Sequence, residues 1–190
     1  MKSLVFLIAL LLTSYWSYAQ KSLAQHLLDS VTAANPRIVD PGLLKLDLKY
    51  GFRDLRFETP LARVKNAVAF SPAGGLRMYR RTGESKKIGT ASASDIQYAF
   101  YKGRLAGVCI MTKGYGNSQA ILKAFQALYG EGKKENPAVE KYIWGAEKTL
   151  MTYEQNSVTN DAMIYMYSFP VMDAKAADEA KAAEDAGSDL

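Results

Sequence analysis

The chain has 190 residues, of which 48% are hydrophobic, and its formal net charge is +5. This length is enough for one domain with a hydrophobic core of its own, so a disulfide-stapled miniature is excluded. A single cysteine and a single histidine leave almost no material for disulfides, Cys/His metal sites or His-based catalytic triads. Composition therefore excludes more chemistry than it indicates.

The first nineteen residues have the form of a signal peptide. Lys2 gives a positive start, residues 4–12 are an unbroken apolar run, and Ser17 and Ala19 place small residues where a signal peptidase reads. We expect cleavage after Ala19 and export to a periplasm or the cell exterior. The run is shorter than the roughly 20 residues of a membrane-spanning helix and has no successor, so we expect no membrane span in the mature chain.

Residues 20–45 are predicted to form an N-terminal helix and a lead-in to the main domain. The helix is indicated by apolar residues at helical spacing before Pro36, namely Leu23, Leu27, Leu28 and Val31. The stretch "PRIVDPGLLKLDLKY", from Pro36, contains two prolines and a glycine, which favours an extended segment. A single domain is then expected over residues 46–172.

That domain begins with a short strand and a short helix. Phe52, Leu55 and Phe57 supply the strand, while Thr59 and Pro60 suit the start of a helix whose apolar positions continue to Val68. The interleaved arginines Arg53, Arg56 and Arg63 fit the solvated side of such a unit. The alternative is that Arg53 and Arg56 line an anion site near the start of the helix.

A second strand and helix unit follows. The strands "LRMYRRT", "DIQYAFYK" and "RLAGVCIM" precede a helix, "SQAILKAFQALYG", that Asn117 can cap and Gly130 can end. The strands "VEKYIW", "KTLMTYE" and "AMIYMYSF" come after it. Short turns favour antiparallel pairing, so we predict an α+β fold with two strand-helix-strands units and the helices on one face of the sheet.

Several of these stretches together resemble a family of uncharacterised exported bacterial proteins. They are the Ala-Gln that ends the leader, "KYGFRDLRFETP", the "YAFYKGRLAGV" hairpin, the helix ending in "YG", and the closing "YIW" and "LMTYE" pair. The resemblance implies export and an α+β fold. It implies no activity, because that family has no assigned substrate or catalytic residues.

We predict no catalytic, cofactor-binding or metal-binding residues, and no cofactor. The sequence has no G-x-S-x-G, H-E-x-x-H or Cys-x-x-Cys, and the loop "KGYGNSQ" before the main helix lacks the spacing of a nucleotide motif. Cys109 lies in an apolar strand and is expected to be buried and unpaired. Two distant carboxylates that converge in space would still allow a hydrolase.

Two surfaces are candidates for binding. The first is a basic hairpin, either a solvated sheet edge or a salt-sensitive attachment to acidic polymers: Arg77, Arg80, Arg81, Lys86 and Lys87. The second is an aromatic set that strand alternation places on one face, either core or an exposed site for a peptide, a glycan or a second subunit: Tyr142, Trp144, Tyr153, Tyr165 and Tyr167.

Residues 173–190 form an acidic, alanine-rich tail with six acids and two lysines. It lacks large apolar residues before Leu190, which predicts disorder or a frayed helix that acts as a mask, a tether or a solubilising terminus. We therefore expect an exported, non-enzymatic binding module of the envelope or exterior. Its partner would be an envelope protein, a glycan or an acidic surface polymer, and we expect no nucleic acid.

Overall fold

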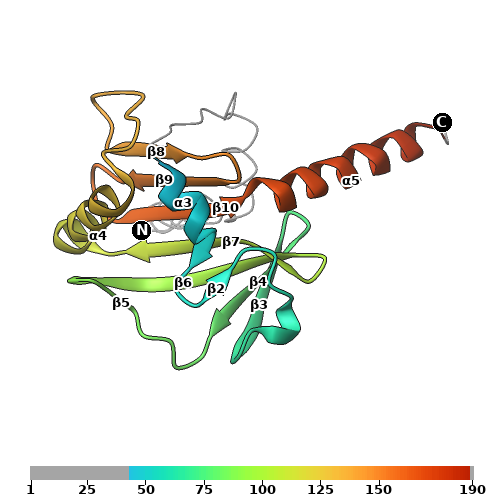
Figure 1. Cartoon of the computed structure of the whole chain (residues 1–190), viewed down its shortest axis with the longest axis horizontal. Helices are drawn as coiled ribbons and strands as arrows, with labels where there is room; N and C mark the ends of the chain where they lie inside the picture. Colours follow the sequence, from blue (N-terminus) through green and yellow to red (C-terminus); the bar gives the residue numbers. More distant parts are fainter. Residues whose placement is uncertain (1–42, 189–190) are drawn as a thin grey trace, which may run out of the picture.

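The computed structural model describes residues 43–188. An antiparallel sheet forms the centre of the molecule, and a long C-terminal helix extends away from it (Figure 1). The predicted signal peptide and the predicted helix before Pro36 lie outside the described residues. Within the described part, no helix is long and apolar enough to cross a membrane.

The main sheet contains eight strands, and every pairing in it is antiparallel. Seven strands follow the order β3-β4-β6-β7-β10-β9-β8, and β5 pairs with β6. Their bounds are β3 Ala67–Ala73, β4 Leu76–Arg81, β5 Lys87–Ile88, β6 Ala91–Tyr101, β7 Arg104–Thr112, β8 Lys141–Gly145, β9 Thr149–Gln155 and β10 Ala162–Ser168. A separate small hairpin joins β1 Gly51–Phe52 to β2 Leu55–Arg56.

Three α-helices and one 3-10 turn complete the described chain. The helices are α3 Leu44–Lys49, α4 Gly114–Tyr129 and α5 Phe169–Ser188, and the turn is η2 Leu61–Arg63. Helix α4 buries Ile121, Leu122 and Phe125 on one stripe, and Gly130 ends it with a positive φ of 87°. The predicted α+β class and the main helix are therefore confirmed.

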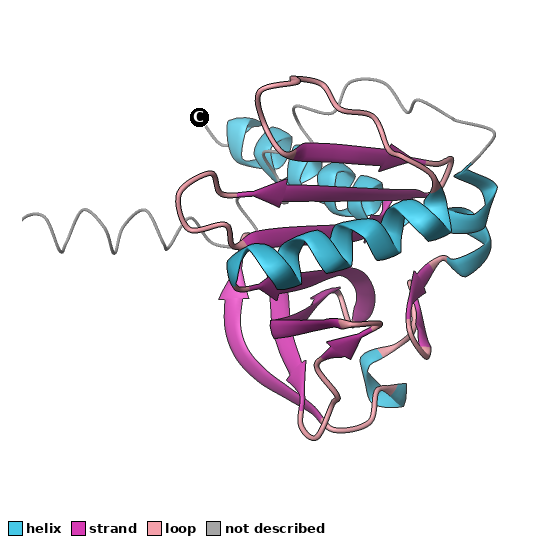
Figure 2. Ribbon diagram, turned by 90° about the vertical axis from the view of Figure 1, so that its left-hand side faces the viewer, coloured by secondary structure: helices cyan, strands magenta, loops and turns pink. Residues whose placement is uncertain are grey.

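Both faces of the central strands are buried, each in its own cluster. On one face α4, α3 and the β1–β2 hairpin pack over side chains such as Tyr98, Ile110 and Tyr153 (Figure 2). On the other face the first turns of α5 place Phe169, Val171 and Met172 in a second cluster. Cys109 lies in this second cluster, buried and free of any disulfide, as predicted.

We expected the helices to lie on one face of the sheet. This is wrong, because α4 packs in the cluster on one face and α5 packs in the cluster on the other. The first unit also lacks the predicted short helix after Pro60. Its apolar residues form only the turn η2, and residues 67–73 become the edge strand β3. Pro72 suits an edge strand, where its missing N–H breaks no interior ladder.

Two terminal expectations also need correction. The predicted extended lead-in contains the helix α3, which ends at Tyr50 in the left-handed conformation. For the tail we predicted disorder or a frayed helix, and the structure has a continuous helix through Ser188. Alanine has the highest helix propensity, and the pair Lys175–Glu179 at i,i+4 adds local support, with 2.5 Å between Nζ and Oε1.

Candidate functional site

The basic hairpin does not form one cationic patch. Arg80 makes a bidentate contact with Asp95 and stacks 3.8 Å from the ring centre of Phe70. Arg81 pairs with Asp54 at 2.7 Å. Both acids come from parts of the chain outside the turn of the hairpin.

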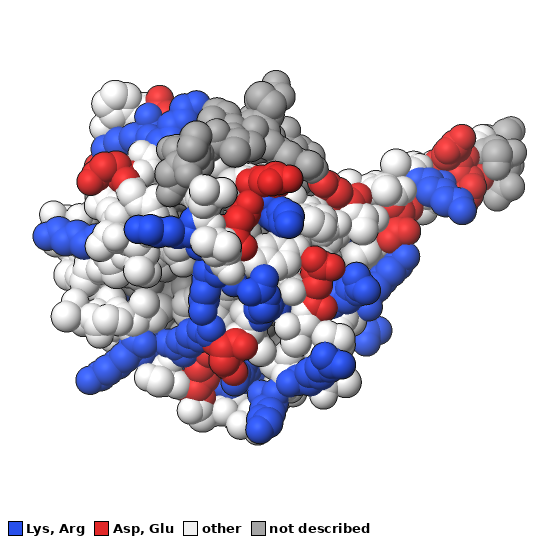
Figure 3. Space-filling view, in the orientation of Figure 1, with Lys and Arg blue, Asp and Glu red and all other residues white. Residues whose placement is uncertain are grey.

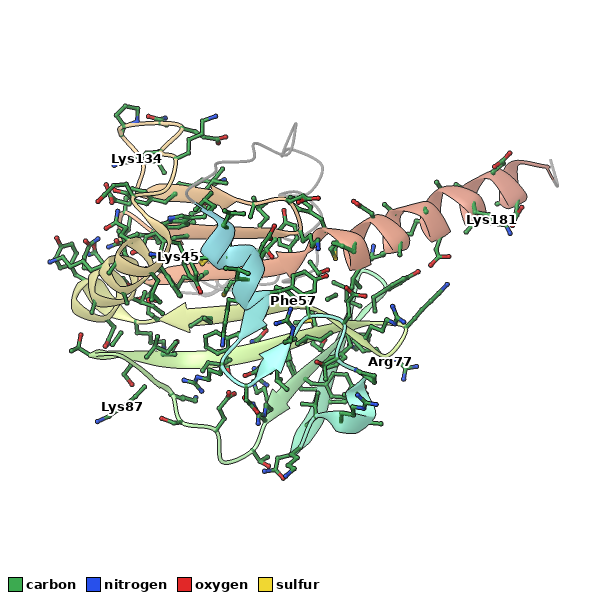
Figure 4. The ribbon with its side chains drawn as sticks, in the orientation of Figure 1. Lys45, Phe57, Arg77, Lys87, Lys134 and Lys181 are labelled. Carbon is green, nitrogen blue, oxygen red and sulfur yellow. The ribbon has the colours of Figure 1, made fainter. Side chains whose placement is uncertain are left out.

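The remaining cations of the hairpin also lie apart. Lys86 donates from Nζ to the carbonyl of Ser94. Arg77 and Lys87 lie far apart at different ends of the sheet (Figure 4). On the face seen in Figure 3, basic and acidic side chains alternate, so no continuous basic strip results.

Arg53 has a structural partner set rather than an open anion site. Its guanidinium donates to Glu84 Oε1 at 2.9 Å and to the carbonyls of Ser85 and Lys87. Tyr98 donates to the same Glu84 oxygen at 2.5 Å. Burial, and to a smaller extent the hydrogen bond to Glu84, raises the pKa of Tyr98 above its usual range. This hydroxyl therefore stays a neutral donor.

The predicted aromatic set is divided between the two faces of the sheet. Tyr142 pairs with Tyr153 and Trp144 pairs with Met151, which places these side chains under α4. Tyr165 and Tyr167 alternate with Ile164 and Met166, so they belong to the opposite cluster. Trp144, Tyr153, Tyr165 and Tyr167 are all buried. The expectation of one shared face is therefore wrong, because the register of β9 and β10 is shifted by one residue from the assumed one.

A polar hollow lies where α4 begins and where β9 turns into β10. It has a volume of about 700 Å³ and is open to solvent. Its lining comes from the first turns of α4, the loop before β8 and the β9–β10 turn: Tyr115, Gln119, Ala138, Val139, Glu140, Glu154, Gln155, Asn156, Ser157 and Asn160. We call it the polar hollow.

A fixed set of amides forms the floor of the polar hollow. Gln155 Oε1 accepts hydrogen bonds from Gln119 Nε2 at 2.8 Å and from Tyr153 Oη at 2.9 Å. Gln155 Nε2 donates to Asn160 Oδ1 at 3.3 Å. Burial raises the pKa of Tyr153 above its usual range, so Tyr153 remains a donor. The free ends of Gln119 and Asn160 are thus held in place before any ligand arrives.

The rim of the polar hollow carries two carboxylates and an exposed aromatic ring. Glu140 accepts from Lys134 at 2.6 Å and from the Tyr142 hydroxyl at 3.2 Å. Glu154 lies 3.6 Å from Lys141. Tyr115, in the first turn of α4, is 64% exposed. The rim therefore offers hydrogen-bond acceptors together with one flat apolar surface.

The first backbone N–H of α4 is bonded by a side chain of the protein itself. Asp161 Oδ1 accepts from the backbone N–H of Gly114 at 2.9 Å, and Asn117 Oδ1 accepts from Ser92 N–H. Asn117 therefore does not cap the helix, which begins three residues before it. A negative side chain at this helix start takes the position that a bound anion would need.

A second hollow, of about 390 Å³, lies at the opposite end of the strands. Its lining joins β4, the β6–β7 hairpin and the turn η2: Leu61, Gly75, Arg77, Tyr79, Phe100, Tyr101, Lys102 and Gly103. Leu61 is held against the hairpin by its N–H, which donates to the carbonyl of Gly103 at 2.8 Å. We call it the basic hollow; of the predicted cations it contains only Arg77.

Sequence reasoning missed both hollows. The polar hollow is built from residues near 115, 139 and 155, which no local motif connects. The polar run "QNSVTND" between two apolar strands was the available signal, because it marks a turn rich in side chains that form hydrogen bonds. Among the described residues, no group of three or more acids, histidines or cysteines could hold a metal ion.

Comparisons with known proteins give no further indication of the site's role. No family model, no curated protein and no solved structure matches this chain.

Proposed function

We propose that the chain is an exported, non-enzymatic binding module of the cell envelope or exterior, and that a neutral glycan binds in the polar hollow. The observation that carries this proposal is the fixed amide floor made by Gln119, Gln155 and Asn160. Export rests on the signal-peptide pattern of residues 1–19.

The chemistry of the polar hollow suits a polyhydroxylated ligand. Sugar hydroxyls both donate and accept, and they can pair with amide groups and with the rim carboxylates of Glu140 and Glu154. The exposed ring of Tyr115 can cover the apolar side of a sugar ring. Because the floor is fixed by internal hydrogen bonds, less side-chain conformational freedom is lost when a ligand binds.

The test is calorimetric titration of the mature chain with a panel of neutral oligosaccharides, compared with a Tyr115→Ala variant. We expect Tyr115→Ala to weaken binding by about two- to tenfold, because an aromatic contact contributes roughly 0.5–1.5 kcal/mol. Leu128→Ala is the matched control, since Leu128 is 55% exposed near the other end of α4. Equal losses in the two variants, or no binding of any oligosaccharide at millimolar concentration, would refute the proposal.

A second variant tests the floor directly. Gln119→Leu keeps most of the side-chain volume but removes the donor to Gln155 and the free amide oxygen. We expect weaker binding with an unchanged circular dichroism spectrum, because Tyr153 and Asn160 still hold Gln155. Unchanged affinity would show that the floor does not contact the ligand.

A hydrolase is the second candidate, because Glu140 and Glu154 line the same polar hollow. Against it, Glu140 is paired with Lys134 and Glu154 is exposed beside Lys141, whereas a general acid needs apolar surroundings that favour its protonated form. Prolonged incubation with any bound oligosaccharide, followed by product analysis, distinguishes the two functions. Cleavage that Glu154→Gln abolishes, with binding retained, would establish the hydrolase.

A further inference from the structure

We infer that the basic hollow is a second binding site, which takes an acidic peptide segment of a partner protein, and that Asp178 of α5 competes with that segment for the same groups. This inference concerns the opposite end of the sheet and does not rest on the glycan proposal. It also specifies where the acidic tail would act as the predicted mask, namely at the basic hollow.

The chain itself shows how a carboxylate binds beside the basic hollow. Asp178 Oδ2 accepts from Tyr101 Oη at 2.5 Å and from Lys102 Nζ at 2.7 Å. The hydrogen bond from Lys102, and to a smaller extent the one from Tyr101, lowers the pKa of Asp178. This carboxyl group therefore stays charged. Both Tyr101 and Lys102 also line the hollow. Two groups that recognise a peptide carboxylate are thus already in place.

A third group is still available. The Arg77 side chain is exposed at the hollow and makes no hydrogen bond or ion pair with the residues that the structure describes. Beside it, Tyr79 and Phe100 form an edge-to-face pair, with ring centres 5.2 Å apart, that makes the wall apolar. An arginine with free donors next to an apolar wall favours a ligand that carries a second carboxylate a few residues from the first.

The Asp178 contact is easily displaced, whereas the beginning of α5 is firmly fixed. The side chains of Lys102 and Asp178 are 67% and 44% exposed, and such ion pairs contribute little and are screened by salt. The anchoring side chains lie earlier in the helix, where Val171 and Met172 are buried and Lys175 packs across Gly75. A partner can therefore replace Asp178 without detaching α5 from the sheet.

The observations favour an acidic peptide because the carboxylate that binds in the structure belongs to an acidic helix. The probe is a fluorescently labelled deca-glutamate peptide, titrated with the mature chain at low salt and followed by fluorescence anisotropy. Asp178→Asn should tighten binding by about two- to fivefold, which matches the small contribution of an exposed ion pair. Glu184→Gln removes the same charge from an exposed position farther along α5 and should leave affinity nearly unchanged.

The cations need their own control. Arg77→Ser with Lys102→Ser should abolish measurable binding, while Lys45→Ser with Lys123→Ser, which removes the same charge from exposed positions on α3 and α4, should retain it. Equal losses in the two double variants would mean that net charge alone attracts the peptide. Equal affinities of the wild-type chain and Asp178→Asn would refute the competition, and tighter binding of polygalacturonate than of the peptide would refute the assignment of the ligand.

Discussion

Gly132 is a position where one added methyl group should measurably destabilise the protein. Its φ is 76°, and a Cβ built there would lie 2.6 Å from Cε2 of Trp144. The Trp144 ring cannot move away easily, because it is fully buried and its Nε1 donates to the carbonyl of Gly130 at 2.8 Å. The backbone is also held, since Lys133 and Ile143 exchange two hydrogen bonds of 2.7 and 2.9 Å.

Gly132→Ala therefore combines two costs. A left-handed alanine costs roughly 1–2 kcal/mol, and forcing a methyl group into a packed site costs roughly 1–3 kcal/mol more. Gly83→Ala isolates the first cost, because Gly83 has nearly the same φ of 73° and nothing within 4 Å of its added Cβ. We expect the free energy of unfolding to fall by about 2–5 kcal/mol in Gly132→Ala and by about 1–2 kcal/mol in Gly83→Ala.

The assay is urea denaturation followed by far-ultraviolet circular dichroism, which does not depend on the environment of Trp144. A loss in Gly132→Ala no greater than in Gly83→Ala would refute the reasoning, because the Trp144 contact would then add nothing. The loop after Gly132 also supplies Val139 and Glu140 to the polar hollow. Gly132→Ala should consequently weaken glycan binding as well.

Three further predictions concern single groups. Cys109 should resist thiol reagents until the protein unfolds, because it is buried and burial raises the pKa of its thiol; rapid labelling of the native chain would contradict this. Burial raises the pKa of Tyr50 to about 12 from 10.0, so the contribution of Tyr50 to stability should be constant below pH 10 and be lost between pH 10 and 12, because the unfolded chain loses that proton first; Tyr50→Phe should make the fall of stability in this range less steep, while the other buried tyrosines still contribute to it. Arg53→Ser should lower the free energy of unfolding by about 1–3 kcal/mol, because Glu84 loses a charged donor. The control is Arg63→Ser at an exposed position, and it should have little effect when both variants are compared by thermal unfolding.

The parts of the fold that could be predicted are those that local chemistry determines. Strands β6, β7, β9 and β10 are rich in aromatic and β-branched residues, and Gly130 ends α4 as expected. Strand β3 was missed because its residues Val68 and Phe70 are 51% and 40% exposed, as an edge strand allows. The sequence of β3, "AVAFSPA", is apolar but does not alternate regularly with polar residues, so it lacks the pattern that identifies a half-buried strand.

The candidate sites depend on tertiary structure, and this explains why sequence reasoning placed them wrongly. The three residues between β8 and β9 and the turn after Gln155 fix the register, which puts Tyr165 opposite Thr152 rather than beside Tyr153. The basic hairpin lost its apparent charge because Asp54 and Asp95 approach it only in the folded chain. The sequence identifies the side chains, but it does not show which strands lie in which register or which charged groups form ion pairs.

The position of both hollows follows from how the sheet is covered. Side chains on both faces of β7 and β10, such as Ile110 and Cys109, are buried, so the middle of the sheet offers no surface to a ligand. The two hollows found among residues 43–188 lie at the ends of the strands, where turns and helix termini expose polar groups. At one end the β9–β10 turn and the start of α4 form the polar hollow, and at the other the β6–β7 hairpin forms the basic one. On the two proposals above, a neutral glycan and an acidic peptide would therefore bind at opposite ends of the same sheet, without competing for one site.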